Sequence, residues 1–212
     1  DSSQSRGLGD VYKRQFVTGA QLCDYYTCEI YPTNRGRFAQ VINRKVDYPA
    51  EFGYGLVTNK WLLETFSGRI GLIGANTKMN IIQNLMEAPQ YQDYLGLEKF
   101  EDYISLPQKF ACDDIDATEQ MVAEQLKNST SKIFLMGMGH VKSGLIHRLK
   151  KHANAVFLDV GASIDALAGI IDVNRPFAGD WTNYQIDEPH LYEGVDFLAY
   201  EGQGKHITLS RE

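Results

Sequence analysis

Residues 132–165 read KIFLMGMGHVKSGLIHRLKKHANAVFLDVGASID, and this stretch decides the fold. It contains two short apolar runs, residues 133–136 and 155–158, with a glycine-punctuated turn and an amphipathic segment between them. Runs that far apart do not pair as a hairpin, whereas parallel neighbours joined by a crossover helix suit this spacing. The stretch therefore predicts a strand, a turn, a helix and a second strand, with any ligand beyond the carboxyl ends of the strands.

The rest of the chain supplies neighbours for this unit. Apolar runs predict strands at residues 69–74 and 102–106, and a last edge strand at 205–209. Apolar periodicity and capping signals predict helices at 34–46, 60–66, 78–87, 91–97, 113–128 and 166–171, whereas the Gly-Tyr-Gly at 53–55 reads as a turn. We therefore expect an α/β protein with a Rossmann-like three-layer fold and a mainly parallel central sheet, formed as a single domain by residues 16–212.

Residues 1–15 show neither periodicity nor an apolar face. The string DVYKRQ at 10–15 resembles the translation of a transposon-end adapter used in preparing sequencing libraries. We therefore expect residues 1–15 to be a non-native flank and the natural chain to continue upstream of Phe16, with a natural disordered tail as the alternative.

Composition and charge exclude several classes of function. A net charge of −6 and a pI near 5.4 provide no basic field to recruit a phosphate backbone, so we expect no nucleic-acid partner. No apolar run approaches the roughly 18 residues that span a bilayer. Cys23, Cys28 and Cys112 show neither a disulfide framework nor zinc-ligand spacing, which is typical of a reducing compartment, so we expect a cytoplasmic protein.

The turn of the opening stretch is the first candidate site. Gly137, Gly139 and Gly144 give G-x-G-x-x-x-x-G, which departs from the dinucleotide fingerprint G-x-G-x-x-G. Glycines here allow backbone N–H groups to approach a phosphate at a helix N-terminus, where His140 could also hydrogen-bond a diphosphate. A turn that needs positive φ without any ligand, and a plain surface histidine, remain the alternatives.

Carboxylates follow the next predicted strand. Asp159 closes that strand, where a carboxylate can accept hydrogen bonds from ribose hydroxyls, or alternatively cap the turn at Gly161. Asp165 follows in the predicted first turn of a helix capped by Ser163, where the helix dipole alone would favour it. For an acceptor we consider Arg175, Asp180 and Trp181, because an indole face suits a sugar ring and a guanidinium suits phosphate.

From about Trp61 to Trp181 the order of these features resembles the GT-D class of glycosyltransferases. The resemblance lies in the strand end IGLIG at Gly74, the I-x-L-P strand end at residues 104–107, the turn GMGHVKSG and the strand end LDVGASID. In that family the last strand ends in an Asp-Ile-Gly-His-like string with an acidic residue shortly after. Here Asp159-Val160-Gly161 matches, the histidine is replaced by Ala162, and Asp165 falls one residue late.

The resemblance implies a cytoplasmic enzyme with a nucleotide-sugar donor, a glycan or glycoprotein acceptor, and a divalent metal (Mn or Mg). Gly74, Gly137, Gly139, His140, Asp159 and Asp165 would then bind the nucleotide sugar. The family holds its metal with an Asp-x-Glu motif near the amino terminus, and this chain contains no such motif. Either the motif lies in the missing upstream part or the chain is divergent, so no metal ligand is assigned. A NAD(P)-dependent oxidoreductase or epimerase, and a non-catalytic nucleotide-binding module for surface polysaccharide assembly, are the rival hypotheses.

Overall fold

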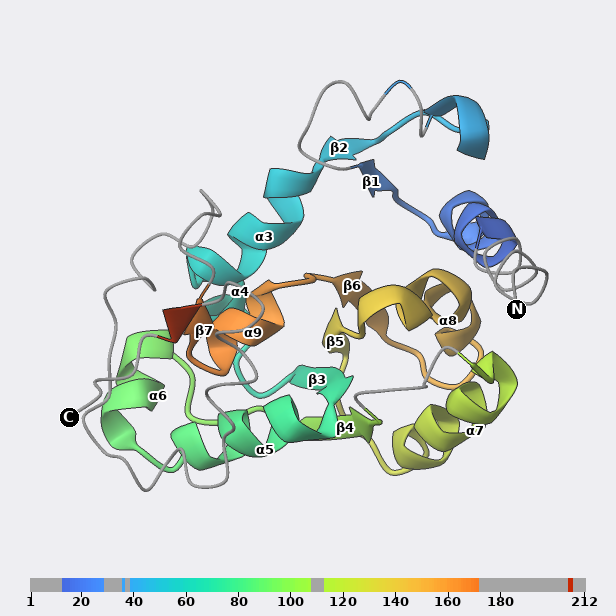
Figure 1. Cartoon of the computed structure of the whole chain (residues 1–212). Coiled ribbons are helices and arrows are strands. Elements are labelled where there is room, and N and C mark those ends of the chain that lie inside the picture. The colour runs from blue at the N-terminus through green and yellow to red at the C-terminus, as the bar shows by residue number, and fades with distance from the viewer. Residues whose placement is uncertain (1–12, 29–35, 37–38, 108–112, 172–205, 208–212) are drawn as a thin grey trace.

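The computed structural model describes residues 13–28, 36, 39–107, 113–171 and 206–207 (Figure 1). Within these ranges, parallel strands form a central sheet in the order β4-β3-β5-β6. The strands are β3 (Ile70–Ala75), β4 (Asp102–Leu106), β5 (Ile133–Gly137) and β6 (Val156–Asp159). β5 and β6 pair in parallel with Met136 opposite Asp159, which confirms the crossover unit and the α/β Rossmann-like class.

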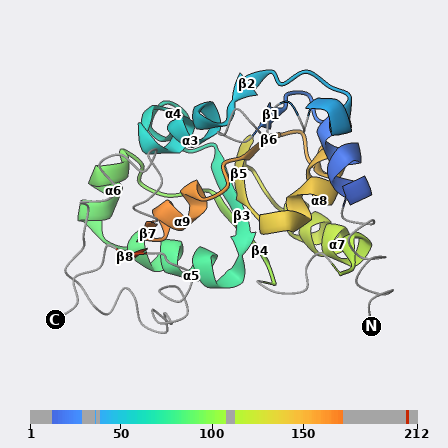
Figure 2. The same cartoon turned by 45° about the horizontal axis from the view of Figure 1, so that its top comes forward.

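Helices cover both faces of the sheet, because the strands alternate their apolar side chains between two cores. Leu72 and Leu135 pack with α3 (Ala50–Thr58), α4 (Trp61–Thr65), α5 (Asn76–Leu85), α6 (Pro89–Leu95) and α9 (Ser163–Leu167). Ile73 and Phe134 point the other way, into a core shared with α7 (Ile115–Leu126) and α8 (Lys142–Leu149). Figures 1 and 2 show this division of helices between the two faces.

Shorter elements surround this frame. β1 (Thr27–Cys28) pairs in parallel with β2 (Tyr48–Pro49), and β7 (Ile170–Ile171) pairs antiparallel with β8 (His206–Ile207). The 3₁₀ turn η1 (Gly139–Val141) leads into α8, and a helix runs over residues 13–22. Within the described ranges, no helix combines the length and the apolarity that crossing a bilayer requires.

The structure corrects the expected elements at two places. Residues 53–55 are not a turn but lie inside α3, where the packing of Val57 in the core overrides the low helix propensity of glycine. The helix expected at 166–171 ends at Leu167, and Ile170 and Ile171 instead form β7 against β8, which lies within the predicted edge strand 205–209. Both segments are short, so a few tertiary contacts determine whether they form a helix, a strand or a turn.

The helix over residues 13–22 crosses the expected flank boundary at residue 15. It lies against α8: a Cβ added at Gly144 would be 3.5 Å from Cβ of Gln15, and one at Gly19 would collide with the Ser143 carbonyl oxygen. The non-native origin of residues 1–15 stays a prediction.

Candidate functional site

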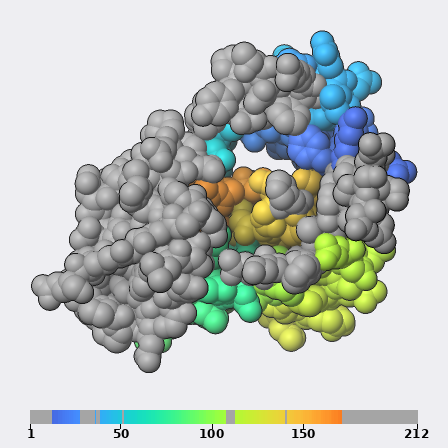
Figure 3. Space-filling view, viewed as in Figure 1, coloured from blue at the N-terminus to red at the C-terminus, as the bar shows by residue number. Residues whose placement is uncertain are grey.

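A cavity of about 320 Å³ lies beyond the carboxyl end of β6. Its walls come from the helix at 13–22, the segment leading into β1, α3, the start of α8 and the loop after β6. Figure 3 shows the surface hollowed between the blue N-terminal segment and the yellow and orange atoms of α8 and the loop before α9. The lining residues are Phe16, Gly19, Ala20, Cys23, Tyr25, Tyr26, Thr27, Ala50, Gly53, Tyr54, Lys142, Ser143, Ile146, Asp159 and Gly161.

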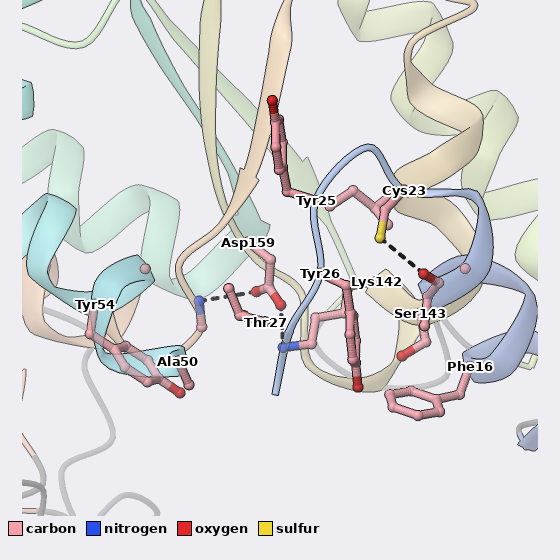
Figure 4. A pocket seen from close by; sticks show the side chains of 15 residues that line it. Phe16, Cys23, Tyr25, Tyr26, Thr27, Ala50, Tyr54, Lys142, Ser143 and Asp159 are labelled. Carbon is pink, nitrogen blue, oxygen red and sulfur yellow. Dashed lines mark hydrogen bonds and ion pairs between the residues drawn. The ribbon is translucent and has the colours of Figure 1, made fainter. Parts of the chain in front are cut away.

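Asp159 is held at the base of this cavity by two contacts. Its Oδ2 atom lies 2.6 Å from Nζ of Lys142, and its Oδ1 atom accepts a 3.1 Å hydrogen bond from the backbone N–H of Gly161 (Figure 4). The crossover explains the pairing, because it brings the first residue of α8 to the edge of the sheet where β6 ends. Each carboxylate oxygen can accept a second hydrogen bond, and the side chain is one-third exposed, so Asp159 caps its turn and still presents acceptors to the cavity.

Aromatic rings form much of the remaining wall. Phe16, Tyr25, Tyr26 and Tyr54 all line the cavity (Figure 4). Tyr54 packs on the turn after β6, where a Cβ added at Gly161 would lie 3.3 Å from its ring and where φ is +51°. Among the described residues, the cavity therefore combines flat apolar faces with one carboxylate and one ammonium group, a combination typical of sites for small polar ligands with rings.

Cys23 lies in the wall beside Arg44. Its thiol donates to the Ala20 carbonyl at 3.2 Å, and the Arg44 guanidinium donates to the carbonyl oxygens of Ala20 and Cys23 and contacts the sulfur. Burial raises the pKa of the Cys23 thiol, and this effect outweighs the opposing influence of Arg44. Cys23 is therefore a protonated wall residue and not an activated nucleophile.

The glycines of the predicted turn have different surroundings. A Cβ added at Gly137 would lie 2.7 Å from Cβ of Ile164, and one at Gly74 would lie 2.9 Å from the Met79 methyl group. Their need for glycine follows from close packing against neighbouring side chains, and neither lines the cavity. Gly139 has φ +58° with open space beside it, and His140 is the second residue of η1.

Asp165 lies at the carboxyl ends of β3 and β5, away from the cavity lining. It forms a buried ion pair with Lys78 of α5, and the two side chains are 9% and 16% exposed. Ser163, the expected cap, does not cap α9: Ala162 occupies that position without a side-chain hydrogen bond, and the buried Ser163 hydroxyl has no partner in the described part of the chain. Arg175, Asp180 and Trp181 lie outside the described residues.

Sequence reasoning missed Lys142 and the aromatic wall. No sequence motif marks Lys142, because a lysine at a helix start is not a distinctive pattern. The clustering of tyrosines in residues 25–54 was the available signal for the wall, and only the tertiary fold shows which of them converge.

The expected divalent metal finds no ligand set in the described ranges, where no group of three or more histidine, cysteine, aspartate or glutamate side chains converges. Among the described residues that line the cavity, Asp159 is the one carboxylate. Comparisons with protein-family models, with curated proteins and with solved structures found no match for this chain.

Proposed function

We propose that the cavity beyond β6 binds a nucleotide sugar, and that the chain is a glycosyltransferase acting on a glycan or glycoprotein acceptor. The observation that carries this proposal is the Asp159–Lys142 pair inside an aromatic-lined cavity at the carboxyl end of a parallel strand. Open α/β sheets bind nucleotides at this end of their strands. Among nucleotide ligands we favour a sugar donor, because the order of strands, turns and helices resembles that of the GT-D class.

Each group of the cavity has a defined task in this proposal. The carboxylate of Asp159 accepts hydrogen bonds from ribose or sugar hydroxyls, and the Gly161 N–H and Lys142 hold it in place. The Lys142 ammonium has three donors, of which one is used on Asp159, so the others can bind diphosphate oxygens and stabilise the charge of the leaving nucleotide. The rings of Tyr26 and Tyr54 supply faces for the base or the sugar.

Calorimetric titration with UDP-glucose, UDP-N-acetylglucosamine, GDP-mannose, UDP, NAD and NADP tests the proposal. We expect binding of at least one nucleotide sugar, and a Kd raised about 10- to 100-fold in Asp159→Asn, because a hydrogen bond to a charged group contributes about 1.5–3 kcal/mol. Glu124→Gln is the matched control, since this carboxylate on α7 is 69% exposed and lies outside the cavity lining.

The other outcomes separate the rival functions. Binding of NAD or NADP with no response to nucleotide sugars would replace the proposal with an oxidoreductase or epimerase. Equal binding of UDP and UDP-sugars, with no sugar released or transferred, would favour a non-catalytic nucleotide-binding module. No binding of any nucleotide would overturn all of these functions.

A further inference from the structure

A row of three exposed aromatic side chains leads from the cavity to the surface. We name Tyr25, Tyr48 and Phe52 the aromatic row: the ring centroids of Tyr25 and Tyr48 are 5.9 Å apart, and those of Tyr48 and Phe52 are 5.2 Å apart. Their residues are 70%, 43% and 56% exposed. Three adjoining aromatic residues that leave this much surface to water indicate a binding surface, because such groups are usually buried.

The row is continuous with the cavity through Tyr25, which belongs to both. Figure 4 shows the side chains of Tyr25 and Tyr26 pointing in opposite directions from neighbouring positions, Tyr26 beside Lys142 and Tyr25 away from it. Both residues precede β1, and Tyr25 lies in a bend of the backbone. A ligand lying on the row would therefore have one end at the mouth of the cavity.

We infer that the aromatic row is a subsite for carbohydrate, where the rings of an oligosaccharide stack while its end enters the cavity. Axial C–H groups of a pyranose carry partial positive charge and pack favourably on the negative face of an aromatic ring. The phenolic hydroxyls of Tyr25 and Tyr48 can exchange hydrogen bonds with sugar hydroxyls at the ring edges. This inference rests on the proposed function, because it assigns the row to the acceptor of the transfer reaction.

Two observations favour a carbohydrate over other partners. A net charge of −6 opposes adsorption of an exposed aromatic surface to an anionic membrane. The rings of Tyr48 and Phe52 stack with planes 21° apart, so each covers one face of the other, and at 43% and 56% exposure the two residues still offer ring surface on which the C–H groups of a sugar can pack. A second copy of this chain or another protein would also bind aromatic side chains, and the experiment below separates these cases.

Saturation-transfer NMR and calorimetry with maltohexaose, cellohexaose and chitohexaose test the inference. We expect at least one of these neutral oligosaccharides to bind, with ring signals of the sugar saturated through the aromatic row. Phe52→Ala and Tyr48→Ala should each weaken binding about 2- to 12-fold, the range that one aromatic contact provides. Tyr48→Phe keeps the ring and should restore most of the affinity.

Trp61→Ala is the matched control, because Trp61 is as exposed as Phe52 and lies on α4 outside the row. It should leave oligosaccharide binding unchanged, and circular dichroism should show all four variants folded. No binding of any of the three oligosaccharides at millimolar concentration would overturn the inference. A dimer in sedimentation that Phe52→Ala dissociates would also overturn it, in favour of self-association.

The two proposals fail in distinguishable ways. Asp159→Asn should raise the Kd for the nucleotide sugar and leave the Kd for the oligosaccharide unchanged, whereas Phe52→Ala should do the reverse. Oligosaccharide binding without nucleotide-sugar binding would keep the carbohydrate subsite and remove the transferase. Nucleotide-sugar binding with no oligosaccharide binding would keep the proposed function and remove the subsite.

Discussion

Glu119 should make the stability of this protein depend on pH in the acid range. This α7 carboxylate is 10% exposed and contacts three basic groups at the end of α8: Nζ of Lys151 at 2.6 Å, Nε2 of His152 at 2.7 Å and a guanidinium nitrogen of Arg148 at 3.1 Å. Burial alone would raise the pKa of Glu119, but these contacts outweigh it and lower the pKa from 4.5 to about 2. The cluster joins α7 to α8, and α8 carries Lys142 of the cavity.

The sign and size of the effect follow from these pKa values. The unfolded chain binds the proton at Glu119 more tightly than the folded chain, so the contribution to stability is complete above about pH 4.5 and is lost as the pH falls toward 2. Since one pKa unit corresponds to 1.36 kcal/mol, the difference amounts to about 3 kcal/mol. Lys151 is 62% exposed, and solvent screening of this partner reduces the expected value to about 2 kcal/mol.

Urea unfolding of the native chain and of Glu119→Gln at pH 7, 5, 4 and 3 measures this contribution. We expect the variant to be about 2 kcal/mol less stable at pH 7, and the difference to shrink steadily below pH 4.5. Glu124→Gln on the same helix is the control, because its exposed pair with Lys127 should contribute less than about 0.5 kcal/mol. A difference that is as large at pH 3 as at pH 7 would refute the reasoning, since packing and not charge would then be lost.

Three further predictions concern buried or partly buried groups outside the cavity lining. Gly137→Ala should destabilise the fold by about 1–3 kcal/mol in urea unfolding, because its methyl group would collide with Ile164; unchanged stability would contradict this packing. Asp165→Ala leaves the Lys78 ammonium without this carboxylate and should cost about 3–5 kcal/mol in the same assay, whereas a loss below 1 kcal/mol would contradict a buried pair. Burial and neighbouring cations lower the pKa of His147, so its imidazole should titrate in NMR spectra with a midpoint below 6.5, and a higher midpoint would contradict its burial.

The sheet could be predicted because its strands carry their own signals. Residues 69–74, 102–106 and 133–136 are short apolar runs bounded by polar or glycine residues, and each became a strand at nearly those positions. The helix α7 begins where Asp114 accepts a hydrogen bond from the Ala117 N–H, a cap visible as an acidic start in the sequence. These features are local, so a single sequence contains them.

The cavity was less predictable because contacts distant in sequence form it. Asp159 was identified from its place at the end of a strand, but Lys142 reaches Asp159, and the ring of Tyr54 reaches Gly161, only through tertiary structure. The glycines show a related difficulty. Some glycines are needed so that a phosphate can approach the backbone, and others so that a neighbouring side chain such as Ile164 can pack there. The sequence does not distinguish these cases, because in both the position has no room for a Cβ.

The cavity lies at the edge of the sheet because α9 fills the crevice between the central strands β3 and β5. Connections from β3 and β5 diverge between these two strands, and ligands of open α/β sheets commonly bind in the crevice that results. Here Ile164 packs above Gly74 and Gly137, and the ion pair of Asp165 and Lys78 lies at the same strand ends, so the protein's own α9 occupies that space. The cavity opens instead beyond β6, where lining residues between 16 and 27 and between 50 and 54 supply the outer wall. The proposed ligand binding therefore depends on residues that lie outside the central sheet.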